Sequence, residues 1–189
     1  GADTFDGGSN IDVIDYSADG SVNFISVTLN TSNNATVIVD GAANDTVRNV
    51  ENVIATGGAD NITGDMLANV IMGLGGDDVI RGGAGADTMD GGVGNDELRF
   101  DELTVSGVAL NLANQTAVYQ LDSSIDTFSN FESYFLTQQD DSVTGSTNAD
   151  VVSTLGGDDL IEASAGNDIY DGGSDFDTIS YATTTGINF

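Results

Sequence analysis

Five nine-residue units follow one another in a single register between Ala55 and Arg99: ATGGADNIT, GDMLANVIM, GLGGDDVIR, GGAGADTMD and GGVGNDELR. The sixth position of every unit carries a carboxylate or an amide, and the eighth carries an apolar side chain. The sixth-position residues are Asp60, Asn69, Asp78, Asp87 and Asp96, and the eighth-position residues are Ile62, Ile71, Ile80, Met89 and Leu98. This regularity indicates a chain built from equivalent short units.

The residue types of one unit indicate its chemistry. Glycines such as Gly82, Gly83 and Gly85 permit positive φ angles and a tight turn, and a turn with few side chains exposes its carbonyl oxygens. Asp87 adds a carboxylate beside them, and Ca²⁺ prefers oxygen ligands of both kinds at about 2.3–2.6 Å. We expect the following triplet, residues 88–90, to form a very short strand. Only its central residue should point inward, because side chains alternate between the two faces of a strand.

The register resembles the GGxGxDxUx nonapeptide of the RTX (repeats-in-toxin) family. Residues 82–90 and 91–99 match the whole pattern, and residues 73–81 match except at Leu74. Residues 55–63 lack the first glycines, and residues 64–72 keep only the first glycine of the pattern. The resemblance implies an all-β fold, a right-handed parallel β-roll in which two units form one coil and Ca²⁺ lies between turns stacked one coil apart.

The same resemblance implies the calcium ligands, with on the order of six ions in all. Asp78 is expected to stack between Asp60 and Asp96 on one edge, while Asn69 and Asp87 share the other edge with a weaker site at Asn69. The implied side-chain ligands are Asp3, Asp12, Asp60, Asn69, Asp78, Asp87, Asp96, Asp141, Asp150, Asp159, Asp168 and Asp177. The implied carbonyl ligands lie in the turns at Gly57, Gly73, Gly75, Gly82, Gly83, Gly85, Gly91, Gly92, Gly94, Gly156, Gly166, Gly172 and Gly173.

A second block repeats the first. Its sixth positions are Asp141, Asp150, Asp159, Asp168 and Asp177, and subtracting 81 from each gives the sixth positions of the first block. The amino-terminal segment, residues 1–24, aligns with residues 166–189, so the chain starts and stops at equivalent points of a tandem array with a period of 165 residues. This pattern is typical of an excerpt from a longer solenoid, and we expect further copies to join end to end.

These repeats predict six segments. Residues 1–16 end one repeat block, residues 55–100 and 137–180 form two complete blocks, and residues 181–189 open another spacer. The spacers, residues 17–54 and 101–136, contain alternating apolar residues with Asn/Gly turns such as Asp40-Gly41. We interpret them as wider, largely metal-free coils of the same solenoid. The alternative is a small antiparallel β insert.

The amino-acid composition narrows the range of possible functions. The formal net charge is −28, from 31 acids against three arginines, which disfavours nucleic acid and anionic membranes as partners. There is no cysteine, histidine or lysine, which excludes disulfides and thiolate zinc sites and removes the usual catalytic bases and nucleophiles. No apolar stretch reaches the roughly 20 residues of a membrane helix. Many carboxylates would instead bind a divalent metal.

Three functions fit this sequence, and none of them is catalysis by these residues. The first is a calcium-binding structural repeat of a secreted bacterial protein, such as an adhesin stalk, surface layer or filament. For such a protein, the resemblance to the RTX family implies export by type I secretion and folding outside the cell. The second is the carboxy-terminal secretion and folding module of an exported enzyme. The third is a module that binds cell-surface glycans, for which Tyr119 and Tyr134 would be the stacking residues.

Overall fold

Short β-strands make up all the regular structure in the residues that the computed structural model describes, which are 2–18, 20 and 22–181. These residues contain twenty strands and no helix, so the all-β expectation is confirmed and none of them forms a helix that could cross a membrane. They divide into two compact units. The first unit is Gly1–Leu98 with Phe128–Phe131, and the second is Arg99–Thr127 with Glu132–Phe189. The expected spacer at the carboxyl end lies, beyond residue 181, outside the described residues.

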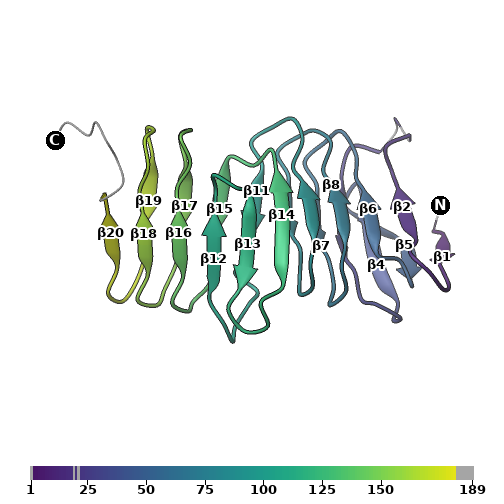
Figure 1. Ribbon diagram of the computed structural model, residues 1–189. Helices are drawn as coiled ribbons and strands as arrows, with labels where there is room; N and C mark the ends of the chain where they lie inside the picture. The colour runs from purple at the N-terminus through teal and green to yellow at the C-terminus, as the bar shows by residue number, and fades with distance from the viewer. Residues whose placement is uncertain (1, 19, 21, 182–189) are drawn as a thin grey trace. The chain divides into compact units, whose positions relative to one another are not determined.

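The repeat block of the first unit forms two layers of parallel strands, as expected for a β-roll (Figure 1). In one layer Ile80 pairs with Ile62 on one side and with Leu98 on the other. In the other layer Val53 and Met89 flank Ile71 in the same way. Two nonapeptides therefore complete one coil, as the sequence predicts. The strands are β6 (Asn52–Ile54), β7 (Asn61–Thr63), β8 (Val70–Met72), β9 (Val79–Arg81), β10 (Thr88–Asp90) and β11 (Glu97–Arg99).

The central residue of each of these strands supplies the core of the first unit. A three-residue strand can point only its middle side chain inward, because its two neighbours face outward. Ile62, Ile71, Ile80 and Leu98 are fully buried, and Met89 is nearly so. Each such side chain stabilises the fold by about 1.5–3 kcal/mol when it leaves water. Each strand contributes only one residue to this core, so much of each repeat lies in the turns between the strands.

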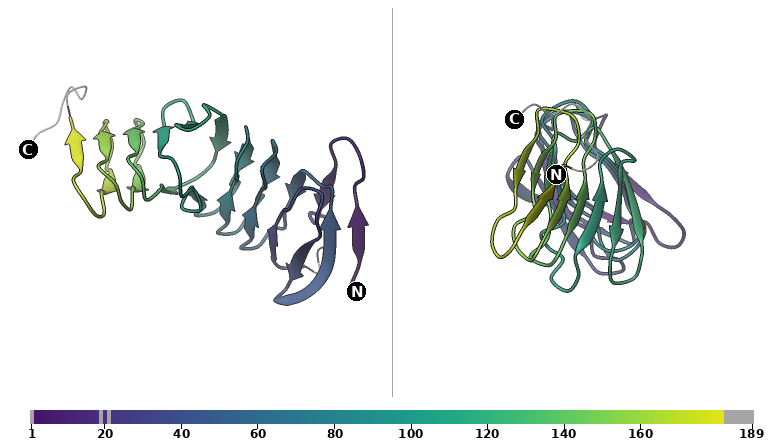
Figure 2. Two further views of the ribbon diagram at one scale, coloured as in Figure 1. Left: turned by 90° about the horizontal axis from the view of Figure 1, so that it is seen from below. Right: turned by 60° about the vertical axis from the view of Figure 1, so that its left-hand side comes forward.

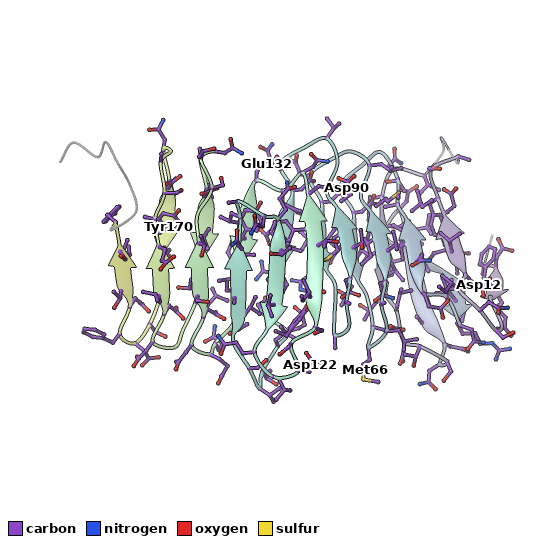
Figure 3. The ribbon with its side chains drawn as sticks, viewed as in Figure 1. Asp12, Met66, Asp90, Asp122, Glu132 and Tyr170 are labelled. Atoms are coloured by element: carbon purple, nitrogen blue, oxygen red, sulfur yellow. The ribbon has the colours of Figure 1, made fainter. Side chains whose placement is uncertain are left out.

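The repeat block of the second unit has the same arrangement (Figure 2). Val143 pairs with Ile161, which pairs with Ile179, and in the other layer Val152 pairs with Tyr134 and Tyr170. Tyr170 is only partly buried, whereas the aliphatic residues Val143, Val152 and Ile161 are buried. The strands are β15 (Ser133–Phe135), β16 (Ser142–Thr144), β17 (Val151–Ser153), β18 (Leu160–Glu162), β19 (Ile169–Asp171) and β20 (Thr178–Ser180).

The first spacer is not a wider coil, and that interpretation of residues 17–54 is corrected. Strands β3 (Ile25–Thr28), β4 (Ala35–Val39) and β5 (Ala42–Arg48) form an antiparallel meander. Between β4 and β5, Asp40 and Gly41 both have positive φ, 50° and 81°, which suits a two-residue hairpin turn. The meander shares a sheet with the repeats, because β3 pairs with β7 in parallel. At the amino end, β1 (Thr4–Asp6) pairs with β5 and β2 (Val13–Asp15) pairs with β6, both in parallel.

The second spacer, residues 101–136, is corrected in the same way. Strands β12 (Val108–Asn111), β13 (Thr116–Tyr119) and β14 (Ile125–Ser129) are antiparallel, and β12 pairs in parallel with β16. The last two residues of β14 belong to the first unit. The physical reason is the loss of glycines at nine-residue spacing. Without them the chain cannot turn after every triplet, so it forms longer strands that reverse at hairpins.

In several of the units the second position of the nonapeptide has a left-handed backbone. Gly83, Gly92 and Gly173 have φ angles of 93°, 101° and 83°. Leu74 and Leu155 occupy the same position with φ angles of 74° and 68°. A residue with a Cβ atom pays a steric penalty in this region, on the order of 1–2 kcal/mol, that glycine avoids. Leu74, which departs from the pattern of its unit, is therefore a strained residue.

We expect Leu74→Gly to raise the free energy of unfolding by up to about 1 kcal/mol, because glycine removes the left-handed strain while little buried surface is lost at this 40% exposed side chain. Urea unfolding at constant calcium measures the change. The matched control is Ala84→Gly, an exposed turn residue without positive φ, which should lower stability by about 0.4–1 kcal/mol. A Leu74→Gly protein less stable than Ala84→Gly contradicts the assignment of strain.

Candidate metal centres

The sixth-position side chains form ladders along the edges of each repeat block. The backbone N–H of a sixth-position residue donates to Oδ1 of the sixth-position residue one coil later, 18 residues along the chain. Asp60, Asp78 and Asp96 are linked in this way by two bonds of 2.8 Å, and Asn69 and Asp87 by one of 2.8 Å. In the second unit the corresponding bonds join Asp141, Asp159 and Asp177 (2.8 and 3.2 Å) and Asp150 and Asp168 (3.1 Å). The predicted stacking register is confirmed.

Asp78 has the strongest features of a metal ligand. Its side chain is 1% exposed, Oδ1 accepts the bond from Asp60, and Oδ2 is buried without a hydrogen-bond partner. Oδ2 and the carbonyl oxygen of Gly91, one coil later, both lie where a side chain at Gly73 would be. We call this space the Gly73 cradle. Two oxygens from successive coils converge on it, which is the donor type that calcium prefers.

The electrostatics of Asp78 favour a cation in the same place. Burial raises the pKa of Asp78 to about 7, and the charges of the neighbouring carboxylates add to the rise. A buried carboxylate without a counter-charge is costly, since its water shell has been removed and nothing replaces it. A proton would relieve this cost by neutralising the group. A bound divalent cation would relieve it while leaving the carboxylate ionised.

Asn69 forms a weaker version of the same arrangement. Its Oδ1 and the carbonyl oxygen of Gly82 converge beside Gly64, which we call the Gly64 cradle. The amide is already engaged, because Oδ1 accepts from the Asp65 N–H at 2.8 Å and Nδ2 donates to the Glu51 carbonyl at 2.6 Å. A neutral side chain with both ends bonded is a poorer cation ligand than Asp78.

The first acid of each block is held by protein donors. Asp60 accepts from the Ile25 N–H at 2.5 Å and from both the N–H and the hydroxyl of Thr56. Asp141 accepts equivalent bonds from the Val108 N–H and from Thr137. No role was predicted for either threonine from the sequence. The signal that could have found them is their shared spacing, since each lies four residues before its aspartate. These carboxylates fasten the meander to the block and have less capacity for a metal.

The remaining predicted carboxylates differ from one another. Asp150 accepts from the N–H and the hydroxyl of Ser146, at 2.8 and 2.7 Å. Near the amino end Asp3 is exposed, while Asp12 donates its N–H to Glu51 at 2.9 Å and has an Oδ2 without a partner. Asp45 and Asp126 are among the buried acids that lie outside the register and were not predicted. They accept hydroxyl bonds from Tyr16 and Tyr119, respectively.

Most of the predicted glycines lie against a carbonyl of a neighbouring turn. A Cβ atom would collide with the carbonyl oxygen of Asp65 at Gly83, of Leu67 at Gly85 and of Leu74 at Gly92. The same holds at Gly73, Gly91, Gly94, Gly166 and Gly173, while at Gly82 and Gly172 it would meet the carboxylates of Asp87 and Asp177. Gly57 faces open space, Gly75 has ordinary contacts, and Gly156 meets side chains only.

Gly76 and Gly157 are among the glycines that the prediction missed and that belong with the close group. Their φ angles are 107° and 105°, and a side chain on either would collide with the backbone of the preceding coil. Both occupy the fourth position of the nonapeptide, so strict use of the register would have selected them in place of Gly75 and Gly156. The turns thus stack backbone to backbone, which keeps their carbonyl oxygens close together.

Backbone oxygens must supply most of any calcium site here. In the part of the chain that the structure describes, no group of three or more histidine, cysteine, aspartate or glutamate side chains is placed to hold a metal. A Ca²⁺ ion takes six to eight oxygen ligands, and backbone carbonyls are among them. The Gly73 cradle offers one carboxylate and at least one carbonyl, so the residues present fit a calcium ion whose remaining ligands are carbonyls and water.

Comparison with known proteins supports this chemistry. Residues 63–98 and 140–179 match the model of the RTX calcium-binding nonapeptide repeat, which describes four copies of the repeat. The matches lie within the two repeat blocks and omit both antiparallel meanders. A search of curated proteins gave no match. The two matched segments belong to the RTX family of calcium-binding nonapeptide repeats.

Proposed function

We propose that this chain is a calcium-dependent structural module of a secreted bacterial protein, and that it completes its folding when it meets calcium outside the cell. The observation that carries the proposal is the buried, unpartnered Oδ2 of Asp78 beside the carbonyl of Gly91. RTX repeats bind calcium and are structural, and we assign no catalytic role to this chain. They typically occur in secreted proteins, which is the basis for the proposed location.

The charge of the chain supports calcium as the trigger for folding. Thirty-one acids against three arginines give a formal charge of −28, and the ladders bring many of these carboxylates close together. Their mutual repulsion opposes folding when no cation is present. The one-residue-wide core supplies limited hydrophobic stabilisation. Calcium would lower the repulsion and bind only the folded coils, so it would shift the equilibrium toward the folded state.

The internal duplication favours a stalk, surface layer or filament as the parent protein. Strands β6, β7, β8 and β9 recur as β15, β16, β17 and β18 after 81 residues, and each block follows an antiparallel meander. Repeating units of this kind build long molecules with similar neighbours at each step. We therefore propose further copies of the repeat, joined end to end, as partners of this chain.

The two tyrosines that suggested glycan binding are buried in the structure. Tyr119 is 4% exposed and donates its hydroxyl to Asp126 at 2.6 Å, and Tyr134 is 9% exposed. Neither ring is available for stacking on a sugar. The secretion-module alternative requires an enzyme elsewhere in the parent protein, and no described residue favours it.

The first prediction is that calcium stabilises the chain strongly. Each ion at 100 times its dissociation constant contributes about 2.7 kcal/mol, so two or more sites would supply a large part of a domain's usual stability. Circular dichroism in chelator should give a weaker β signal and a lower unfolding temperature than in millimolar Ca²⁺. Magnesium is the control, since it prefers a smaller, octahedral site and should stabilise less. Identical spectra and unfolding temperatures with calcium and with chelator would contradict the proposal.

The second prediction separates the metal role of Asp78 from a structural one. Asp78→Asn keeps an oxygen that accepts from Asp60 and removes a buried, unpartnered charge, so stability in chelator should rise by about 1 kcal/mol. Calcium affinity should fall about tenfold or more, because the site loses its carboxylate. Unfolding and calorimetric titration measure the two effects.

Asp77→Asn is the matched control for Asp78→Asn, because it removes the same charge from an exposed neighbour. It should change calcium affinity little. We also expect Asn69→Ala to leave calcium binding nearly unchanged, since Asn69 is neutral and already bonded. Equal losses of affinity in Asp77→Asn and Asp78→Asn would show that only the total charge matters, and would remove Asp78 from the site.

A further inference from the structure

We infer that the two repeat blocks differ in their need for calcium. Cradles in the first block, residues 55–98, are open to an ion, whereas hydroxyl-bearing side chains fill the corresponding places in the second block, residues 137–180. The inference rests on the proposed calcium function and goes further, because it says which copies of the repeat take the metal. Each block is compared with its own equivalent positions, 81 residues apart in the sequence.

The Gly73 cradle provides the first comparison. Its equivalent in the second block is Thr154, which is fully buried. The Thr154 hydroxyl donates to the carbonyl oxygen of Gly172 at 3.0 Å. Gly172 is the equivalent of Gly91, whose carbonyl oxygen is exposed to the cradle in the first block. The threonine thus fills the space and also occupies the carbonyl that an ion would need.

Asp159, the equivalent of Asp78, retains part of the metal-site character. It is 2% exposed, and its Oδ2 has no partner within hydrogen-bond distance. The site has a carboxylate but lacks an open carbonyl and free volume.

The Gly64 cradle provides the second comparison. Its equivalent is Gly145, and the Ser164 and Tyr170 hydroxyl oxygens each lie 2.6 Å from the position of a side chain there. Asp150, the equivalent of Asn69, is bonded to Ser146 and lies 3.5 Å from the Tyr170 hydroxyl. Two hydroxyl-bearing side chains therefore enter the space beside Gly145, whereas beside Gly64 the only side chain among the nearest atoms is that of Asn69.

A third position points in the same direction. At Gly82 a Cβ atom would meet the carboxylate of Asp87, so the turn has room there only because the residue is glycine. The equivalent residue in the second block is Ala163, which carries that Cβ and is 1% exposed. Three consecutive first positions, Gly145, Thr154 and Ala163, are thus filled by their own side chain or by those of their neighbours.

This difference changes what calcium does to each block. The first block has a buried, unpartnered carboxylate oxygen and open cradles, so its folded state depends on a cation to balance the charge. The second block retains one such oxygen, on Asp159, but Thr154 closes the cradle beside it, and Ser146 and Tyr170 donate to Asp150. Removal of calcium should therefore loosen β8 and β9 while their equivalents β17 and β18 remain ordered.

Hydrogen exchange followed by mass spectrometry on the whole chain tests this difference. Transfer from millimolar Ca²⁺ to chelator should increase exchange at least tenfold in peptides from residues 64–98 and much less in peptides from the equivalent residues 145–179. Equal increases in the two blocks would overturn the inference while leaving calcium-dependent folding intact. No change in either block, with no calcium bound, would overturn both the inference and the proposed function.

Reciprocal substitutions test the cause. Thr154→Gly opens the second-block cradle and should add one bound Ca²⁺ ion in native mass spectrometry, whereas Thr154→Val, which keeps the bulk and loses the hydroxyl, should add none. Gly73→Thr should remove one ion from the first block. If Gly73→Thr does not fold, Thr154→Gly still tests the inference. A Thr154→Gly protein that binds the same number of Ca²⁺ ions as the unmodified chain would overturn it.

Discussion

The hydrogen bond from one sixth-position N–H to the next sixth-position carboxylate is the contact on which the repeat blocks depend. It recurs at 18-residue spacing, as between Asp60 and Asp78, and it requires the acid to be buried at a coil edge. Only Oδ1 is used, so each such bond leaves a second oxygen to be neutralised. At Asp78 that oxygen has no protein donor. The geometry that stacks the coils therefore creates the demand for a cation.

Much of the repeat structure could be predicted, because two independent periodicities agree. Glycine at the first positions and an apolar residue such as Ile80 at the eighth both fix the same nine-residue phase. A shift of one residue would turn Ile80 outward and put a Cβ atom against the carbonyl oxygens of the next turn. The phase therefore determined the coil length, the core and the ladders without any structural information.

The meanders and the individual metal sites could not be predicted in this way. Alternating apolar residues such as Ile25 and Val27 fit a parallel coil and an antiparallel hairpin equally well, because both bury every second side chain. Turns such as Asp40-Gly41, in which both residues have positive φ, reverse the chain and make the flanking strands antiparallel. Likewise, the register makes Asp60 and Asp78 equivalent. Only the structure reveals that Thr56 satisfies the first, whereas the second has an unpartnered oxygen.

Sequence duplication also does not imply chemical equivalence. A buried carboxylate can be stabilised by a cation or by several neutral hydrogen-bond donors, and the two solutions need opposite local packing. A cation needs open carbonyls and a residue without a side chain, as at Gly73, whereas the Thr154 hydroxyl occupies the carbonyl of Gly172 and the Ser146 hydroxyl donates to the carboxylate of Asp150. A repeat can therefore exchange metal dependence for hydroxyl packing through one substitution at its first position while its strands, register and core stay the same.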